Sequence, residues 1–291
     1  MSTTAINDPL FGQALAAIDA DDPAALQSLL TAHPELVTRR LDTPLEGYFR
    51  RPFLLWFLAD NPIRTGSWPA KIFDITNNII TAVRQHAPGS LQFQLDYALE
   101  LIATGRTARL SGKQIDLIDL LIDAGAIPNN GLSAVAQGNN EAAARLVERG
   151  ASLTLPLAVG LQRTDDIIPL LQQATPTDIE LAITVAAFTG KHELLQLLVK
   201  SGIDLDAFPA TDSGFHSHAT ALHQAVQACA PQAVHLLVTA GANTSIIDLV
   251  YQGTPLDWAI HFEQTNANNP QQKQKWKEII QYLSEIKKSP L

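Results

Sequence analysis

Apolar residues recur at intervals of three and four along most of the chain, which is the spacing that places side chains on one face of an α-helix. In the segment 231–239, for example, Val234, Leu237 and Val238 form such a stripe. Comparable stripes occupy the segments 20–36, 115–126, 140–151 and 165–174. The pattern therefore predicts an all-α protein built from short amphipathic helices.

Glycine follows most of these helices, since a residue without a Cβ tolerates the left-handed conformation that closes a helix. The equivalent positions are Gly125, Gly150, Thr175, Gly202 and Gly241, so the successive intervals are 25, 25, 27 and 39 residues. The three short intervals predict tight turns without regular hairpin fingers. The long interval predicts one enlarged finger at 207–219, and extra residues on one side of a repeat protein usually map to its binding face.

The stretch 220–245 reads TALHQAVQACAPQAVHLLVTAGANTS and resembles an ankyrin repeat. Thr220, Leu222, His223 and Ala225 fall at the positions of the family motif Thr-Pro-Leu-His-x-Ala. The stretch 181–206 is similar to the second part of the preceding unit, and GTPLDWA at 253–259 opens the following one. By this register Thr220 is expected to cap an inner helix with its hydroxyl oxygen.

The resemblance implies an ankyrin-repeat solenoid of about eight stacked helix pairs, in a single domain over residues 1–291. The repeats are divergent in 8–127 and clearer in 128–291, most of all at 181–260. It also implies a module that is not an enzyme, carries no cofactor and binds an unknown protein partner. Its concave face and the long finger are expected to contact that partner.

Three histidines, His216, His218 and His223, lie within the long finger and the helix that follows it. In an extended segment His216 and His218 point to the same side, because strand side chains alternate. Together with Asp212 the three imidazoles supply the nitrogen and oxygen ligands that Zn²⁺ prefers, so a metal or small-ligand site is one alternative. The other is a finger whose histidines form structural hydrogen bonds, and the resemblance gives His223 that role.

Trp258 occupies the position after the motif histidine, which in ankyrin repeats points into the concave groove. Gln224 is its counterpart in the preceding repeat, and Tyr251 lies in the turn between them. An exposed tryptophan here would be a strong partner anchor. The alternative is that the insertion at 261–277 folds back and covers it. The predicted partner-binding residues are Phe208, Asp212, Phe215, His216, His218, Gln224, Tyr251 and Trp258.

The formal net charge of −9 disfavours nonspecific nucleic-acid binding, because phosphates attract basic surfaces. Cys229 is the single cysteine, so no disulfide forms within the chain. No apolar run is long enough to span a membrane, and the first residues show no secretory signal. We therefore expect a cytoplasmic monomer that binds neither nucleic acid nor membrane.

Arginines near the N-terminus offer a further hypothesis. Arg50, Arg51 and Arg64 flank the aromatic-rich stretch 52–59 and are candidates for the rim of a pocket for an acidic partner. Known catalytic patterns are missing from the sequence: it has neither G-x-S-x-G nor H-E-x-x-H. The glycines of 105–114 are also spaced wrongly for a phosphate-binding loop.

Overall fold

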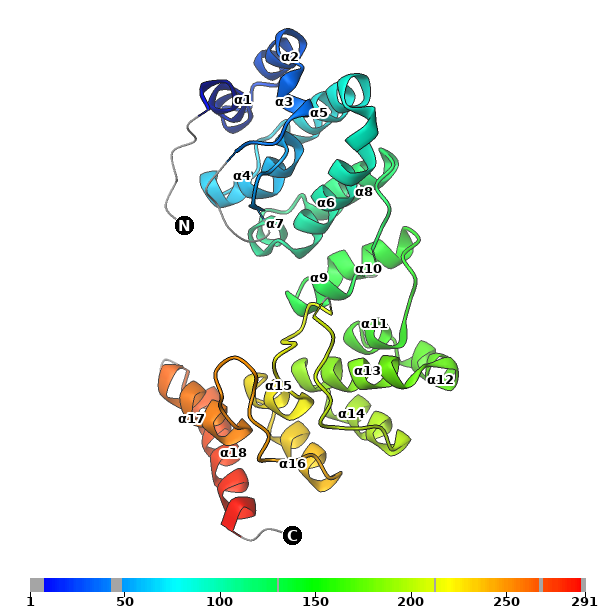
Figure 1. Ribbon diagram of the computed structural model, residues 1–291, viewed down its shortest axis with the longest axis vertical. Helices are drawn as coiled ribbons and strands as arrows, with labels where there is room; N and C mark the ends of the chain where they lie inside the picture. The colour runs from blue at the N-terminus through cyan, green and yellow to red at the C-terminus, as the bar shows by residue number, and fades with distance from the viewer. Residues whose placement is uncertain (1–7, 43–48, 130, 212, 267–268, 289–291) are drawn as a thin grey trace. The chain divides into compact units, whose positions relative to one another are not determined.

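The computed structural model describes residues 8–42, 49–129, 131–211, 213–266 and 269–288. These residues form α-helices and short 3-10 helices and contain no β-strand, so the predicted all-α class is confirmed. Contacts between Cα atoms divide the chain into two compact units, residues 1–152 and residues 153–291 (Figure 1). We call them unit 1 and unit 2. The expectation of one repeat domain over the whole chain stays a prediction.

Unit 1 contains four successive pairs of helices. They are α1 (Pro9–Asp19) and α2 (Pro23–Ala32), α4 (Phe57–Thr65) and α5 (Ile72–His86), α6 (Leu91–Thr104) and α8 (Gln114–Asp123), and α9 (Leu132–Ala136) and α10 (Asn140–Glu148). The short helices α3 (Glu35–Thr38), η2 (Leu54–Trp56), η3 (Pro88–Ser90) and α7 (Arg106–Leu110) lie between them. First helices pack on first helices, as α4 does on α6 and α6 on α9, while α2 packs on α5 and α8 on α10.

Unit 2 has four more pairs and is the more regular unit. They are α11 (Leu155–Gly160) and α12 (Thr164–Gln173), α13 (Pro176–Phe188) and α14 (His192–Leu198), α15 (Ala221–Gln227) and α16 (Pro231–Thr239), and α17 (Pro255–Thr265) and α18 (Pro270–Lys288), with η4 (Val199–Ser201) after α14. The first helices pack in the order α11, α13, α15, α17, and α14, α16 and α18 form a second row. Two rows of helix pairs agree with the predicted solenoid, and the described residues give the expected number of pairs.

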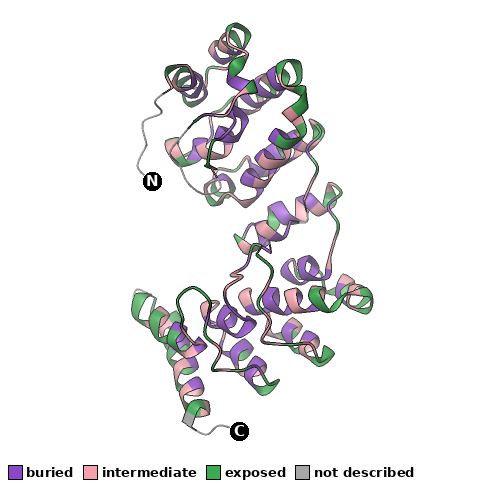
Figure 2. Cartoon of the chain, in the orientation of Figure 1, coloured by how far each residue is buried: buried purple, intermediate pink, exposed green. Residues whose placement is uncertain are grey.

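Small residues allow the first helices of unit 2 to approach closely. Ala182 and Ala186 on α13, Ala225 on α15 and Ala259 on α17 are all fully buried. The buried positions lie on the faces that meet neighbouring helices, while the outer faces are exposed (Figure 2). A single pair would leave such a face in water, so each pair depends on its neighbours for burial.

The helix ends follow the predicted glycine rule with one exception, Thr175. Gly125, Gly150 and Gly241 adopt φ of 109°, 110° and 104°, the region in which a Cβ is costly. Thr175 does not replace a glycine: it is the N-cap of α13, where it forms a capping box with Asp178. α12 ends at Gln173, two residues before Thr175, just as α8 ends two residues before Gly125, but the chain leaves α12 in an extended conformation at Ala174, so no left-handed residue closes this helix.

The predicted role of Thr220 is also wrong. Thr220 is the N-cap of α15 by position, but its side chain accepts no backbone N–H. Its hydroxyl lies 2.9 Å from Nδ1 of His223 instead. The hydroxyl of Thr220 therefore bonds to the ring of His223 and not to a backbone N–H group in the first turn of α15.

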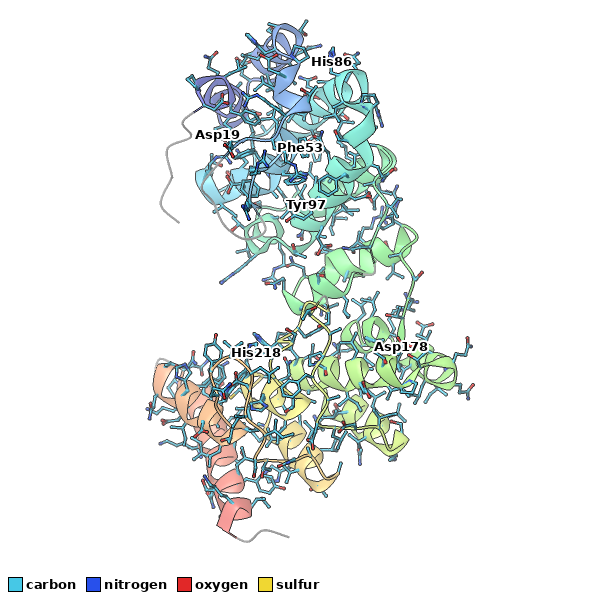
Figure 3. All side chains as sticks on the ribbon, viewed as in Figure 1. Asp19, Phe53, His86, Tyr97, Asp178 and His218 are labelled. Carbon is cyan, nitrogen blue, oxygen red and sulfur yellow. The ribbon has the colours of Figure 1, made fainter. Side chains whose placement is uncertain are left out.

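A cluster of aromatic rings in unit 1 surrounds the guanidinium group of Arg40 (Figure 3 labels Phe53). The Cζ atom of Arg40 lies 5.0 Å from the ring centroid of Phe53, 5.4 Å from that of Trp56 and 5.2 Å from that of Phe93. Three rings within this range make a favourable site for a cation, because each ring face carries negative charge. Phe53 and Trp56 are both buried, so these rings belong to the core of unit 1.

We expect Arg40→Gln to lower the free energy of unfolding by about 1–2 kcal/mol, because it removes the charge from the aromatic faces. Urea unfolding followed by circular dichroism measures this. Arg40→Lys should restore part of the loss, whereas Arg106→Gln, at an exposed arginine on α7, should change stability by less than about 0.5 kcal/mol. Equal effects at positions 40 and 106 would contradict the cation–π interpretation.

Candidate partner-binding site

Gln224 and Trp258 lie on α15 and α17, and the other predicted partner-binding residues that the structure describes lie on two neighbouring loops of unit 2. The first is the long finger, residues 207–219, between η4 and α15; the second is the turn 245–253 between α16 and α17. The backbone N–H of Leu249 donates to the carbonyl oxygen of His218 over 2.9 Å, which joins the two loops directly. His218 is labelled in Figure 3.

A fully buried carboxylate, that of Asp248, organises the turn. Its Oδ1 accepts from the backbone N–H groups of Val250, at 2.9 Å, and Tyr251, at 2.6 Å. Its Oδ2 accepts from the N–H of Gly253 and from Nε1 of Trp258, both at 2.9 Å. Burial by itself raises the pKa of this carboxyl, but the four donated bonds outweigh burial and hold the pKa well below its ordinary value of 3.8.

His218 adds a fifth contact to Asp248. Its Nδ1 lies 3.2 Å from Oδ1 of the carboxylate, so Nδ1 carries the proton and donates. The ring of His218 also contacts the rings of Tyr251 and Trp258, with centroid distances of 5.5 and 5.8 Å. His218 therefore links the long finger to the buried carboxylate and to the aromatic residues around it.

Trp258 is buried, with 7% of its surface exposed. Three histidine rings cover it: the ring centroids of His218 and His216, on the long finger, lie 5.8 and 6.2 Å from its own, and that of His223, on α15, lies 5.1 Å away. Phe262 contacts it from its own helix, at 6.0 Å. The exposed-tryptophan alternative is therefore wrong, and the cover comes from the long finger and α15 as well as from Phe262 at the start of the segment 261–277.

Two other predicted contact residues are also buried. Phe215 is 7% exposed and packs edge-on against Phe188 with a centroid distance of 5.1 Å. Gln224 is fully buried, and its Nε2 donates to the carbonyl oxygens of His216 and Ala219. These side chains hold the finger against α13 and α15, and their burial leaves them inaccessible at the surface of this structure. The motif position of Gln224 does not reveal its burial, because the long finger that covers it is not part of the motif.

The three histidines do not form the metal site considered above. His223 uses both ring nitrogens: Nε2 donates to the carbonyl oxygen of Gly253 over 3.1 Å, and Nδ1 therefore accepts from the hydroxyl of Thr220. Burial lowers the pKa of His223, and it also lowers that of His216. Asp212 lies outside the described residues, and within the described part of the chain no group of three His, Cys, Asp or Glu side chains is arranged to hold a metal ion.

The residues that remain accessible form an apolar surface. In the apolar turn, which we define as residues 247–251, the exposed fractions are 46% for Ile247, 62% for Leu249, 59% for Val250 and 74% for Tyr251. Phe208 on the long finger is 37% exposed, and His216 and His218 are half-buried. Four large apolar side chains exposed within five residues mark a contact surface more clearly than scattered ones do.

Leu249 and Val250 were not among the predicted site residues, nor was Asp248. The available signal is an aspartate inside the apolar run IIDLVY, at 246–251. An acidic residue among large apolar residues in a turn indicates either that the whole turn is exposed to solvent or that the carboxylate is buried and accepts hydrogen bonds. In this turn the carboxylate of Asp248 is buried, and the apolar side chains next to it are exposed.

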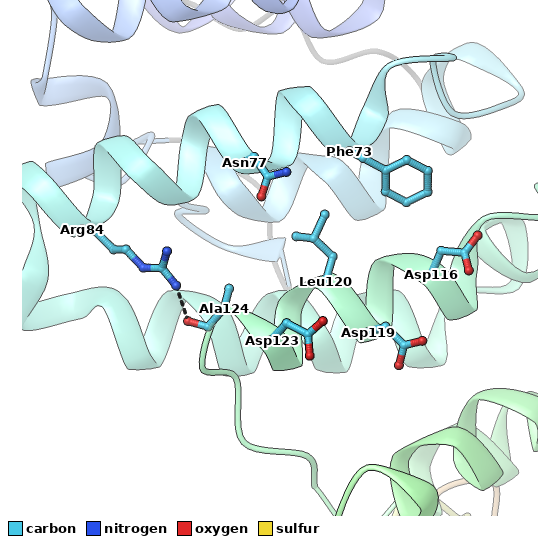
Figure 4. A pocket seen from close by; sticks show the side chains of 8 residues that line it. All are labelled: Phe73, Asn77, Arg84, Asp116, Asp119, Leu120, Asp123 and Ala124. Atoms are coloured by element: carbon cyan, nitrogen blue, oxygen red, sulfur yellow. Dashed lines mark hydrogen bonds between the residues drawn. The ribbon is translucent and has the colours of Figure 1, made fainter.

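A groove in unit 1 lies between α5 and α8 (Figure 4). It has a volume of about 580 Å³, and Arg84 spans one end by donating to the carbonyl oxygen of Ala124 over 2.7 Å. Asp119 on its wall accepts from Arg145 at 2.7 Å and from Arg149 at 2.6 Å. These carboxylate contacts are internal ion pairs that join α8 to α10.

The arginine hypothesis fails for Arg64. Its guanidinium pairs with Asp19, with 2.6 Å between Nη2 and Oδ1, and also with Asp60. Arg51 lies 3.7 Å from a carboxylate oxygen of Asp42. Arg64 is thus neutralised within unit 1 and is not positioned as the rim of an anion pocket.

Solved structures similar to this chain are ankyrin repeat domains. The human ASB11 ankyrin repeat domain has a TM-score of 0.34 and 16% identity, covering 93% of this chain and 96% of its own. The ankyrin repeat domain of Bcl-3, described as a unique member of the IkappaB protein family, has a TM-score of 0.31 and 18% identity, covering 69% of this chain and 92% of its own. Neither a protein-family model nor a curated protein matches the chain.

Among the described residues, no helix is both long and apolar enough to cross a bilayer.

Proposed function

We propose that this chain is a protein-interaction module whose contact surface consists of the apolar turn and the accessible part of the long finger. The observation that carries the proposal is the combination of exposed apolar side chains and an internally fixed backbone in residues 247–251. A surface that is already ordered loses little conformational entropy on binding. A partner that covers these apolar groups removes them from water, which is favourable.

The individual residues take different roles in this proposal. Tyr251, Phe208, His216 and His218 contact the partner, as do Leu249 and Val250. Phe215, Gln224 and Trp258 support the surface from below. Removing the segment 209–217 would delete the buried Phe215, so single substitutions at exposed positions test the surface more cleanly than a deletion.

A catalytic role has no support from the one cysteine. Burial raises the pKa of the Cys229 thiol, and its Sγ donates to the carbonyl oxygen of Gln272 over 3.3 Å. A thiol that is buried and protonated is a poor nucleophile. The proposal is therefore a binding protein rather than an enzyme, and it includes the expected cytoplasmic location and monomeric state.

Site-specific photocrosslinking tests the proposed surface. We expect p-benzoylphenylalanine in place of Tyr251 to give a discrete covalent adduct with a partner protein in the native cells, because this side chain is the most exposed of the apolar turn. Phe93, an exposed aromatic residue of unit 1, provides the matched control position. Adducts of the same kind and yield at positions 251 and 93, or none at position 251, would contradict the proposal.

A further inference from the structure

The sequence around the contact surface lacks positive charge from lysine and arginine. No lysine or arginine occurs between Lys200 and Lys273, and the same stretch contains six carboxylate residues. They are Asp204, Asp206, Asp212, Asp248, Asp257 and Glu263. We call residues 201–272 the cation-free segment. It includes the long finger, α15, α16, the apolar turn and α17.

Asp257 is an exposed carboxylate of this segment, in the first turn of α17. A Cβ atom on Gly253 would be 3.5 Å from the Cβ of Asp257. Hydrogen bonds from the side chain and the backbone N–H of Thr254 lower the pKa of Asp257, and Lys287 on α18 acts in the same direction. Glu263, in contrast, is paired with Lys273 at 3.5 Å. Asp257 is therefore a negative charge close to Gly253, two residues after the apolar turn, with Lys287 on α18 as a neighbouring positive charge.

Tyr251 supplies a second attraction for a cation. One side of its ring contacts His218, with a centroid distance of 5.5 Å, while most of the residue is exposed to solvent. An aromatic face in this setting binds a lysine or arginine side chain with a favourable cation–π energy. The exposed aliphatic side chains of Leu249 and Val250 lie immediately before it in the chain.

We propose that the partner presents a segment in which aliphatic side chains are flanked by lysine or arginine. This inference rests on the proposed function and adds the chemistry of the partner. Leu249 and Val250 would pack on the aliphatic part, and Asp257 and Tyr251 would attract the basic groups. A second copy of this chain fits less well, since a symmetric interface would bring the cation-free segment against itself. Anionic lipid headgroups are disfavoured for the same electrostatic reason.

Defined peptides test the inference by fluorescence polarisation. The probes are twelve-residue peptides with a central Ile-Leu pair flanked by zero, two or four lysines, and a matched series with glutamate in place of lysine. We expect affinity to rise with the number of lysines, to fall with added salt, and to be absent for the glutamate series. Leu249→Ser with Val250→Ser should weaken binding of the lysine peptides by about tenfold or more.

Asp257→Asn should weaken binding of the lysine peptides about threefold, the size of one partly exposed ion pair, and should leave binding of the peptide without lysine unchanged. Because Asp257 also forms a capping box with Thr254, Asp178→Asn is the matched control, since Asp178 forms the same box with Thr175 on α13 (Figure 3). Equal losses at positions 257 and 178 would overturn the inference.

Several other results would also overturn it. They are equal affinity for the lysine and glutamate series, no peptide binding at all, and unchanged binding by the Leu249→Ser, Val250→Ser variant. The same holds if sedimentation shows a dimer that this variant dissociates, or if the protein co-sediments with phosphatidylcholine vesicles through these residues. A partner crosslinked at position 251 together with no preference for lysine would leave the proposed function standing and remove only this inference.

Discussion

Trp258→Ala should lower the free energy of unfolding by about 3–5 kcal/mol, the range found when a large buried aromatic side chain is truncated. The indole is 7% exposed, touches three histidine rings, and donates to Oδ2 of Asp248 over 2.9 Å. The alanine variant leaves a cavity and also removes one donor from a buried carboxylate. Urea unfolding followed by circular dichroism measures the loss.

Two further variants separate the contributions. Trp258→Phe keeps much of the ring volume but lacks the N–H group, so it should show the cost of the missing hydrogen bond without the full cavity. Phe208→Ala removes an aromatic side chain that is 37% exposed and should cost less than about 1 kcal/mol. If Trp258→Ala were no more costly than Phe208→Ala, the burial of Trp258 under the long finger would be wrong.

Asp248→Asn should be the second large effect, a loss of about 3 kcal/mol at neutral pH. Asparagine has the same shape, but it loses the charge, and one of its two terminal atoms becomes a donor that faces other donors. The backbone N–H groups of Val250, Tyr251 and Gly253 and the indole of Trp258 then lack part of their acceptor. The variant should therefore loosen the apolar turn as well as lower stability.

The pH dependence of this variant has a defined sign. The folded-state pKa of Asp248 is depressed below the ordinary value of 3.8, so its contribution to stability is complete above that value. The contribution is lost as the pH falls toward the folded-state pKa. The stability difference between wild type and Asp248→Asn should therefore be constant near neutral pH and should narrow below about pH 4.

Asp165→Asn is a suitable control for this series, since Asp165 is an exposed residue in the first turn of α12. It should change stability by less than about 1 kcal/mol at neutral pH. A stability difference for Asp248→Asn that widens on acidification would show that the carboxylate is not stabilised in the folded state.

The regular part of the fold could be predicted from the sequence because local chemistry determines it. The apolar stripe of α16 and the glycine at 241 each act within one or two turns of a helix, and both were predicted correctly. The first helices pack through small residues such as Ala225, whose position follows from the repeat register. Short-range patterns of this kind are visible in a sequence because their partners lie a few residues away.

The burial of the site could not be predicted, because it depends on residues distant in sequence. Phe215 is buried since Phe188 lies against it, and Trp258 is buried since three histidines from the preceding loop and helix cover it. The carboxylate of Asp248 takes three backbone donors from its own turn, but the contacts from Trp258 and His218 come from a helix and a loop outside that turn. A motif position describes where a residue lies in its own repeat, but not what an enlarged loop places above it.

The cation-free segment also has a consequence for regulation. A stretch without an ε-amino group offers no site for lysine acetylation, lysine methylation or ubiquitin attachment. Lysine-directed modification must therefore act elsewhere on the chain, at Lys200 and earlier or at Lys273 and later, and would leave the chemistry of residues 247–251 unaltered. Enzymes that modify lysine could thus mark or remove this protein without first competing with a partner for the residues that the partner contacts.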